Sequence, residues 1–161
     1  MFAELQLQQA ARAIEACRTS GLRLALAESC TGGLIAACLT SVAGASDVLD
    51  RGFVTYANQA KTDLVGVSKT LLEEHGAVSE AVARAMADGA LGNGCHISVS
   101  VTGIAGPGGG SDEKPVGLVH IAAARIGAET RHERHQFSGD RDQIRMQAVA
   151  AALDLLERLA V

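Results

Sequence analysis

Two short segments of the chain carry residue types that suit acyl-transfer chemistry. Ser29 follows the strand-like run 22–27 and Glu28, and it precedes Cys30, a threonine and two glycines, a pattern typical of a strand that turns sharply into a helix. A hydroxyl on such a turn lies at a sheet edge beside unpaired backbone amides. Further along, Lys61 is one of only three lysines, and a lysine, unlike an arginine, can lose its proton and act as a base.

The turn after Ser29 has two interpretations. The amides of Thr31, Gly32 and Gly33 are the first donors of the predicted helix, and such donors can hold an oxyanion. Alternatively, Ser29 or Thr31 is only the N-cap of that helix, and the glycines only permit a tight turn. The G-x-S-x-G elbow of α/β-hydrolases is absent, so that fold gains no support. Both interpretations stay open on the local sequence.

A second group of polar residues follows a predicted strand end. Tyr56, Asn58 and Lys61 come after the strand 51–56, and strand ends in α/β sheets are where sites gather. A lone lysine is more often a solvated surface charge. The segment 111–114 has the S-x-x-K spacing of β-lactamases, but Pro115 disfavours the helical turn that this motif needs. We therefore reject Lys114 and keep Lys61 as the candidate base.

The segment 102–110 contains five glycines and leaves a predicted buried strand. Amides in such a loop can cradle a phosphate or a carboxylate, although the spacing fits neither a Walker loop nor G-x-G-x-x-G. Arg141 and Arg145 lie one turn apart near the start of the last predicted helix, where the dipole disfavours cations. An anionic ligand would relieve that charge, and so would the neighbouring Asp140 and Asp142.

Composition limits the class of protein. The chain has 161 residues, 48% hydrophobic residues and a formal charge of −4, so we expect one globular domain over residues 1–161 with no field that attracts nucleic acid or an anionic membrane. With 2% aromatic residues there is little on which bases could stack. No segment approaches the ~18 apolar residues of a membrane span, and we expect a cytoplasmic protein that is a homo-oligomer.

Metal and disulfide chemistry gain no support. The four cysteines form no C-x-x-C pair and lie mostly among apolar residues, as is typical of reduced core cysteines. His132 and His135 point to opposite faces of a predicted strand, and His120 stands alone. No set of histidines and cysteines has ligand spacing, so we expect no metal site.

Periodicity predicts an α/β fold. Helices are predicted over 5–17, 32–40, 58–64, 69–75, 79–92 and 140–159, and strands over 22–27, 51–56, 96–101, 116–124 and 129–137. Helices and strands alternate in the first part of the sequence, and the two strands 116–124 and 129–137 form a predicted hairpin near its end. This order favours three α/β/α layers around a mixed, mostly parallel central sheet.

Seven motifs, in chain order, carry a family resemblance. They occupy 27–33 (AESCTGG), 44–46 (GAS), 56–61 (YANQAK), 75–79 (HGAVS), 101–107 (VTGIAGP), 114–117 (KPVG) and 139–141 (GDR) with Arg145. Together they resemble the C-terminal domain family of CinA proteins, the nicotinamide-nucleotide amidases. The match runs from about Leu22 to Arg145. Gly108 stands where the family pattern has an acidic residue.

The resemblance implies hydrolysis of nicotinamide mononucleotide to nicotinate mononucleotide and ammonia, in pyridine nucleotide recycling, with neither metal nor cofactor. It implies a Ser/Lys hydrolase in which Ser29 is the nucleophile and Lys61 the base. Tyr56 is a third catalytic candidate, which orients Lys61 or passes a proton to ammonia. The substrate-binding candidates are Thr31, Gly32, Gly33, Asn58, Thr102, Gly103, Ala105, Gly106, Arg141 and Arg145. Among them, the glycine loop and the two arginines are our candidates for the phosphate.

Two rival interpretations remain. A non-catalytic nucleotide-binding or regulatory module of the same family type needs neither a nucleophile nor a titratable base, so the presence of both Ser29 and Lys61 argues against it. A cysteine hydrolase that uses Cys30 fails on geometry, because adjacent residues on a turn rarely present both side chains to one base.

Overall fold

The computed structural model describes residues 2–92 and 94–161. Within them, five strands form one sheet in the order β2-β1-β3-β4-β5. The strands are β1 (Leu24–Glu28), β2 (Leu49–Val54), β3 (Ile97–Gly103), β4 (Leu118–Arg125) and β5 (Arg131–Gln136). β1 runs parallel to β2 and β3, whereas β3–β4 and β4–β5 pair antiparallel. The predicted mixed sheet is confirmed, with its parallel pairing confined to β1, β2 and β3.

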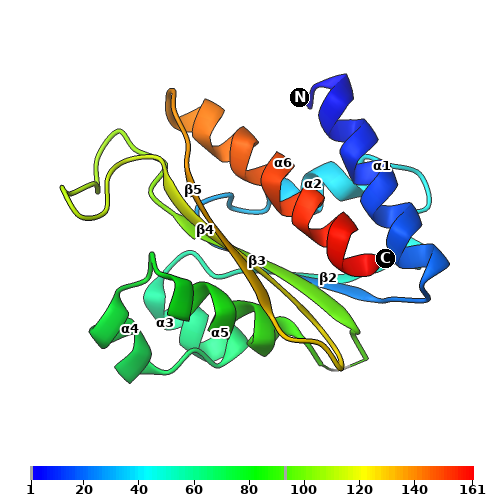
Figure 1. Cartoon of the computed structure of the whole chain (residues 1–161), viewed down its shortest axis with the longest axis horizontal. Helices are drawn as coiled ribbons and strands as arrows, with labels where there is room; N and C mark the ends of the chain where they lie inside the picture. Colours follow the sequence, from blue (N-terminus) through cyan, green and yellow to red (C-terminus); the bar gives the residue numbers. More distant parts are fainter. Residues whose placement is uncertain (1, 93) are drawn as a thin grey trace.

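Helices cover both faces of this sheet (Figure 1). One layer contains α1 (Glu4–Thr19), α2 (Leu34–Thr40) and α6 (Arg141–Ala160), and the other contains α3 (Asn58–Val65), α4 (Lys69–His75) and α5 (Glu80–Ala90). The predicted three-layer α/β/α arrangement is therefore confirmed. None of the helices in the described residues is long and apolar enough to cross a membrane.

The two faces of the sheet differ in side-chain size. Leu24 and Leu26 of β1 point into the larger core beneath α1, α2 and α6, whereas Ala25 and Ala27 point towards α5, as the alternation of a strand requires. Small residues continue across the α5 side, where the buried residues include Ser98, Ser100, Ala122 and Ala124. The α5 backbone can therefore approach the sheet closely.

Serine hydroxyls of β3 bond directly to that backbone. Ser98 Oγ donates to the carbonyl of Ala87, and Ser100 Oγ donates to the carbonyl of Ala83, each at 2.6 Å. Both serines are fully buried, and a buried hydroxyl without a partner is costly. These two bonds fix α5 in position along the strand as well as above it.

The loop ends that carry polar residues meet at one edge of the sheet. β1, β2 and β3 are parallel, so their carboxyl ends lie together, and ligand sites in open α/β sheets lie at this edge. Ser29 follows β1, Thr55 follows β2, and Thr102 lies near the end of β3. α3 begins shortly after β2 and carries Lys61 in its first turn.

The position of α3 depends on a glycine in α5. A Cβ at Gly89 would overlap the carbonyl oxygen of Val65, the last residue of α3. The two backbones therefore touch at this point. Only glycine permits this contact without moving α3, and with it Lys61.

We expect Gly89→Ala to lower the free energy of unfolding by roughly 2 kcal/mol, because the added methyl group overpacks the α3–α5 contact. Urea unfolding followed by circular dichroism measures the change. Helix propensity alone predicts the opposite sign, a gain of about 1 kcal/mol. A more stable Gly89→Ala protein would therefore show that the two helices do not touch here.

Candidate active site

The fold brings Ser29 and Lys61 into contact. Ser29 directly follows β1 and its amide donates to the carbonyl of Val101 at 2.9 Å, which extends the pairing of β1 with β3 by one residue. The Lys61 Nζ atom lies 3.1 Å from Ser29 Oγ. These residues are 32 positions apart in the chain, so the contact is a product of the fold.

The surroundings of Lys61 favour a neutral amine. Its side chain is buried, with 1% of the residue exposed, and burial lowers the pKa of the amine because a charged group loses its solvation there. No carboxylate of the described residues is within ion-pair distance of it. Nζ also lies 2.9 Å from the carbonyl oxygen of Thr55 and 3.4 Å from that of Tyr56. A neutral amine can donate to both carbonyls and keep its lone pair for the Ser29 hydroxyl.

The amides of the turn are used differently from our prediction. Gly33 N–H donates to the Glu28 carboxylate at 3.0 Å, and Gly32 N–H donates to the Ser29 carbonyl at 3.0 Å. The prediction that these two amides are free to hold an oxyanion is wrong, because Glu28 reaches the start of α2 from the end of β1. In the described part of the chain, the amides of Cys30 and Thr31 donate to no other residue.

The N-cap interpretation of the turn is also wrong. The N-cap position of α2 is Gly33, with φ 97°, and no side chain caps the helix from that position. Thr31 is fully buried, and its hydroxyl has no hydrogen-bond partner. Ser29 Oγ bonds to Lys61, so neither hydroxyl caps the helix.

Arg145 supports the turn from the side of α6. Its Nε donates to the carbonyl of Cys30 and its Nη2 to the carbonyl of Thr31, both at 3.1 Å. The guanidinium also lies 3.8 Å from the Asp142 carboxylate. Arg145 does not line the cavity beside Ser29, so this structure gives no support to its predicted contact with phosphate.

That cavity has a volume of about 290 Å³. Nine of the predicted site residues line it: Ser29, Tyr56, Asn58, Lys61, Thr102, Gly103, Ala105, Gly106 and Arg141. Four do not: Thr31, Gly32, Gly33 and Arg145. The fold thus assembles the predicted nucleophile, base and glycine loop around one hollow, and it places the α2 side of the turn outside.

Tyr56 contacts Arg141 across the cavity, not the base. Arg141 Nη2 donates to Tyr56 Oη at 3.0 Å, and Arg141 Nη1 donates to the carbonyl of Gly106 at 2.6 Å. The contact between Tyr56 and Lys61 uses the backbone carbonyl of the tyrosine, so the phenol does not orient the base as we predicted. Among the described residues, no carboxylate pairs with Arg141.

The glycine loop lines the cavity and contains unpaired amides among the described residues. In the part of the chain that the structure describes, the amides of Ala105, Gly106, Gly108 and Gly109 have no backbone or side-chain acceptor, and all four residues line the hollow. Thr102 also lines the cavity, and its hydroxyl donates to the carbonyl of Ala77, another lining residue, at 2.8 Å. The hydroxyl of Thr102 is therefore a poorer donor to a ligand than the sequence led us to expect.

Other reactive side chains are shielded or lie elsewhere. Cys30 lines the cavity but is buried, which raises the pKa of its thiol to about 12. All four cysteines are free and buried, as predicted for Cys17, Cys38 and Cys95. No three His, Cys, Asp or Glu residues in 2–92 and 94–161 are grouped to hold a metal ion. His120 does not stand alone, because β4–β5 pairing brings its Nδ1 to 2.9 Å from His132 Nε2.

Sequence reasoning missed two residues of this region, Glu28 and the carbonyl-bearing Thr55. Glu28 could have been found from strand alternation. If Ser29 points to one face of the sheet, its neighbour points to the other, and the following turn offers the helix no capping side chain at Gly33. Thr55 gave no such signal, because its contribution to Lys61 is a backbone carbonyl.

Comparison with known proteins gives a consistent result. The family model described as the CinA C-terminal domain matches residues 6–160. A CinA-like protein from Syntrophobacter fumaroxidans is 56% identical over 146 residues, which cover 90% of this chain and 34% of that protein. One from Citrifermentans bemidjiense is 52% identical over 159 residues, which cover 98% and 38%. The chain thus spans between about a third and two fifths of the length of these curated relatives.

Solved structures agree over nearly the whole chain. The competence/damage inducible protein CihA from Agrobacterium tumefaciens is 47% identical with a TM-score of 0.96, covering 99% of this chain and 98% of that one. A CinA superfamily protein from Klebsiella pneumoniae is 36% identical with a TM-score of 0.91, covering 96% and 97%. The resemblance carried by the sequence motifs is confirmed.

The Ser29–Lys61 contact predicts a particular pH dependence. Labelling of Ser29 by a fluorophosphonate, measured by intact-protein mass spectrometry, should rise with pH through an ionisation below the ~10.4 of an ordinary lysine, because burial favours the neutral amine. Lys61→Arg keeps the cation but cannot accept a proton near neutral pH, so labelling should fall by about 10²-fold or more, as far as in Lys61→Met.

Lys69→Arg is the matched control, since Lys69 is exposed on α4 and does not line this cavity; its labelling should match that of the wild type. Substantial labelling of Lys61→Arg would show that the residue supplies only charge.

Proposed function

The chain belongs to the CinA C-terminal domain family, and from this we propose that it is an amidohydrolase that converts nicotinamide mononucleotide to nicotinate mononucleotide and ammonia. The observation that carries the proposal is the 3.1 Å contact between the buried amine of Lys61 and the Ser29 hydroxyl. A lysine without a carboxylate partner, held against a hydroxyl in a cavity, is the arrangement that Ser/Lys hydrolysis requires.

The first step is attack by Ser29. Neutral Lys61 accepts the hydroxyl proton while Ser29 Oγ forms a bond to the carboxamide carbon, and the carbonyl oxygen gains the negative charge. Since Glu28 and Ser29 occupy the amides of Gly33 and Gly32, we assign the oxyanion to other donors. The amide of Cys30 directly follows the nucleophile, and among the described residues it donates to no other residue. An amide directly after the nucleophile has this role in other serine hydrolases.

The second step releases ammonia. Lys61, now an ammonium, returns its proton to the amide nitrogen, and the C–N bond breaks to leave an acyl-enzyme on Ser29. Water then attacks the ester carbon while Lys61 accepts its proton, and Lys61 returns that proton to Ser29 Oγ as the ester C–O bond breaks, which restores the serine hydroxyl and releases nicotinate mononucleotide as the carboxylate. The same amine can serve both steps, because the carbonyls of Thr55 and Tyr56 can accept from an amine or from an ammonium.

Arg141 is our candidate for the substrate phosphate, together with the glycine-loop amides. Its guanidinium lines the cavity and has no carboxylate partner among the described residues. A guanidinium and unpaired amides together form a favourable site for phosphate oxygens. Asn58, exposed at the start of α3 and lining the cavity, is our candidate to bind the ribose or the carboxamide.

The burial of Lys61 argues against a purely binding module. An amine that is 1% exposed loses solvation at a cost that only its contacts offset. A module that only binds nucleotide gains nothing from directing this amine at Ser29. Catalysis accounts for both residues and for the distance between them.

The proposal predicts the effect of removing the nucleophile. Ser29→Ala should reduce ammonia release from nicotinamide mononucleotide by about 10⁴-fold or more while the Kd for the nucleotide changes little, because only the covalent step is lost. Cys30→Ala is the neighbouring control and should retain most of the activity. Near-normal turnover by a folded Ser29→Ala protein would refute the assignment, and loss of turnover only in Cys30→Ala would favour a cysteine nucleophile.

A second prediction concerns the phosphate. Arg141→Ala should raise KM for the mononucleotide by about 10²-fold, since charged hydrogen bonds of this kind contribute ~1.5–3 kcal/mol, with a far smaller effect on the corresponding nucleoside. Steady-state ammonia release on both substrates gives the comparison. Arg131→Ala, at an exposed arginine of β5 outside the cavity, is the control. Equal effects on both substrates would place the phosphate elsewhere.

A further inference from the structure

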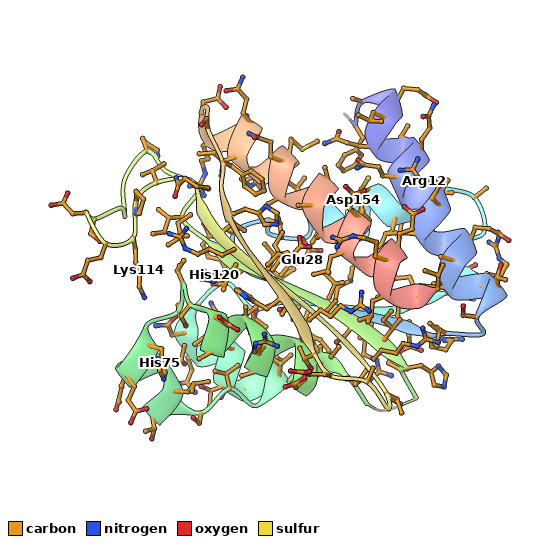
Figure 2. The ribbon with its side chains drawn as sticks, in the orientation of Figure 1. Arg12, Glu28, His75, Lys114, His120 and Asp154 are labelled. Carbon is orange, nitrogen blue, oxygen red and sulfur yellow. The ribbon has the colours of Figure 1, made fainter. Side chains whose placement is uncertain are left out.

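Glu28 directly precedes Ser29, the proposed nucleophile, and its side chain lies on the opposite face of the sheet. It is the last residue of β1 and is buried inside the molecule (Figure 2), with 2% exposed. Alternation along the strand sends its side chain to the α2 side, while the Ser29 hydroxyl meets Lys61 on the α3 side. The carboxylate is therefore outside the cavity and cannot touch a substrate there.

The Glu28 carboxylate holds the beginning of α2. Its Oε2 accepts the amides of Gly33 at 3.0 Å and Ile35 at 3.1 Å, and its Oε1 accepts the amide of Ala36 at 2.9 Å. Amides in the first turn of a helix have no partner within the helix, and the N-cap Gly33 has no side chain to supply one. A residue before the turn thus caps a helix after it, and the chain from Ser29 to Gly32 must curve around the carboxylate.

The main chain of Glu28 also connects the nucleophile to the base. Its carbonyl oxygen accepts the amide of Thr55 at 2.8 Å and the Thr55 hydroxyl at 3.4 Å. The carbonyl of Thr55 in turn accepts from Lys61 Nζ at 2.9 Å. A displacement of the Glu28 backbone would therefore move Ser29, which is the next residue in the chain. It would also move Thr55, whose carbonyl is bonded to Lys61.

Resting on the proposed function, we propose that Glu28 is a positioning residue, whose carboxylate fixes the turn so that Ser29 Oγ faces Lys61 and the Cys30 amide stays free for the oxyanion. A displacement of about 1 Å at a reacting atom can cost on the order of 10²-fold in rate. An ordinary helix cap would contribute to stability alone.

Glu28→Gln tests the role with the smallest change of shape. A carboxamide keeps one acceptor oxygen but turns the other position into a donor, which then faces an amide of α2, so the three bonds cannot all persist. We expect fluorophosphonate labelling of Ser29 and kcat for ammonia release each to fall about 10²-fold. KM and the pH at which labelling rises should stay close to wild type, because the carboxylate does not line the cavity and the main-chain bonds from Glu28 through Thr55 to Lys61 do not use it.

Ser68→Ala is the matched control. Ser68 caps α4 by accepting the amide of Leu71, and it does not line the catalytic cavity. Loss of this cap should reduce stability in urea without changing the rate of labelling. Wild-type labelling in a folded Glu28→Gln protein, or the same loss of labelling in Ser68→Ala, would overturn the positioning role.

Two further results separate this inference from the proposed function. If Glu28→Gln does not fold, Glu28→Asp keeps the charge on a side chain one methylene shorter, and the same loss of labelling is expected; labelling at the wild-type rate would refute the role. If wild-type Ser29 is labelled but nicotinamide mononucleotide releases no ammonia, the substrate is wrong and the positioning role is still decided by labelling. A wild-type protein in which Ser29 is not labelled would overturn both.

Discussion

The arrangement of the whole site depends on a buried amine that has no carboxylate partner among the residues that the structure describes. Lys61 is surrounded by two carbonyl oxygens and one hydroxyl, so its charged form loses solvation and gains no ion pair in return. A surface lysine keeps its interactions with water when its helix moves slightly. Lys61 would instead lose its hydrogen bonds to the carbonyls of Thr55 and Tyr56 at the end of β2. The close contact of α3 with Gly89 and the hydrogen bonds at the end of β2 therefore act together. They hold the Lys61 amine in a buried position that disfavours its charged form.

The turn that carries Ser29 is held from two sides by groups of opposite charge. On one side the Glu28 carboxylate takes amides of α2, and on the other the Arg145 guanidinium takes carbonyls of the turn. Within the turn, the backbone bonds of the described residues are those from Gly32 to Ser29 and from Leu34 to Thr31. Charged side chains make stronger hydrogen bonds than neutral ones. They are thus an effective way to give an irregular segment a fixed shape while its active-site face stays open.

Periodicity and motif spacing predicted most of the architecture and the central pair of residues. The helix that begins after Asp140 has a capping box with Gln143, a feature that depends on residues three apart in the chain. The pair of arginines shows where such reasoning ends. Arg141 and Arg145 lie on one face of a helix by their spacing, yet one reaches the cavity and the other reaches the turn. That difference depends on the tilt of α6 over the sheet, which local sequence does not contain. Likewise, the contact of His120 with a histidine of β5 follows from strand register.

The small-residue face of the sheet beneath α5 limits which substitutions this protein can accept during evolution. Alanines and serines on the sheet meet a helix backbone with hydroxyl-to-carbonyl bonds at 2.6 Å, so this interface has no spare volume. A larger side chain on Ala122 or Ser100 would have to push α5 outwards, and the loop before α5, which includes Ala77 in the cavity wall, would move with it. Sequence drift at this interface is therefore coupled to the geometry of the cavity, and single enlargements should be rarer among active descendants than paired exchanges that conserve volume.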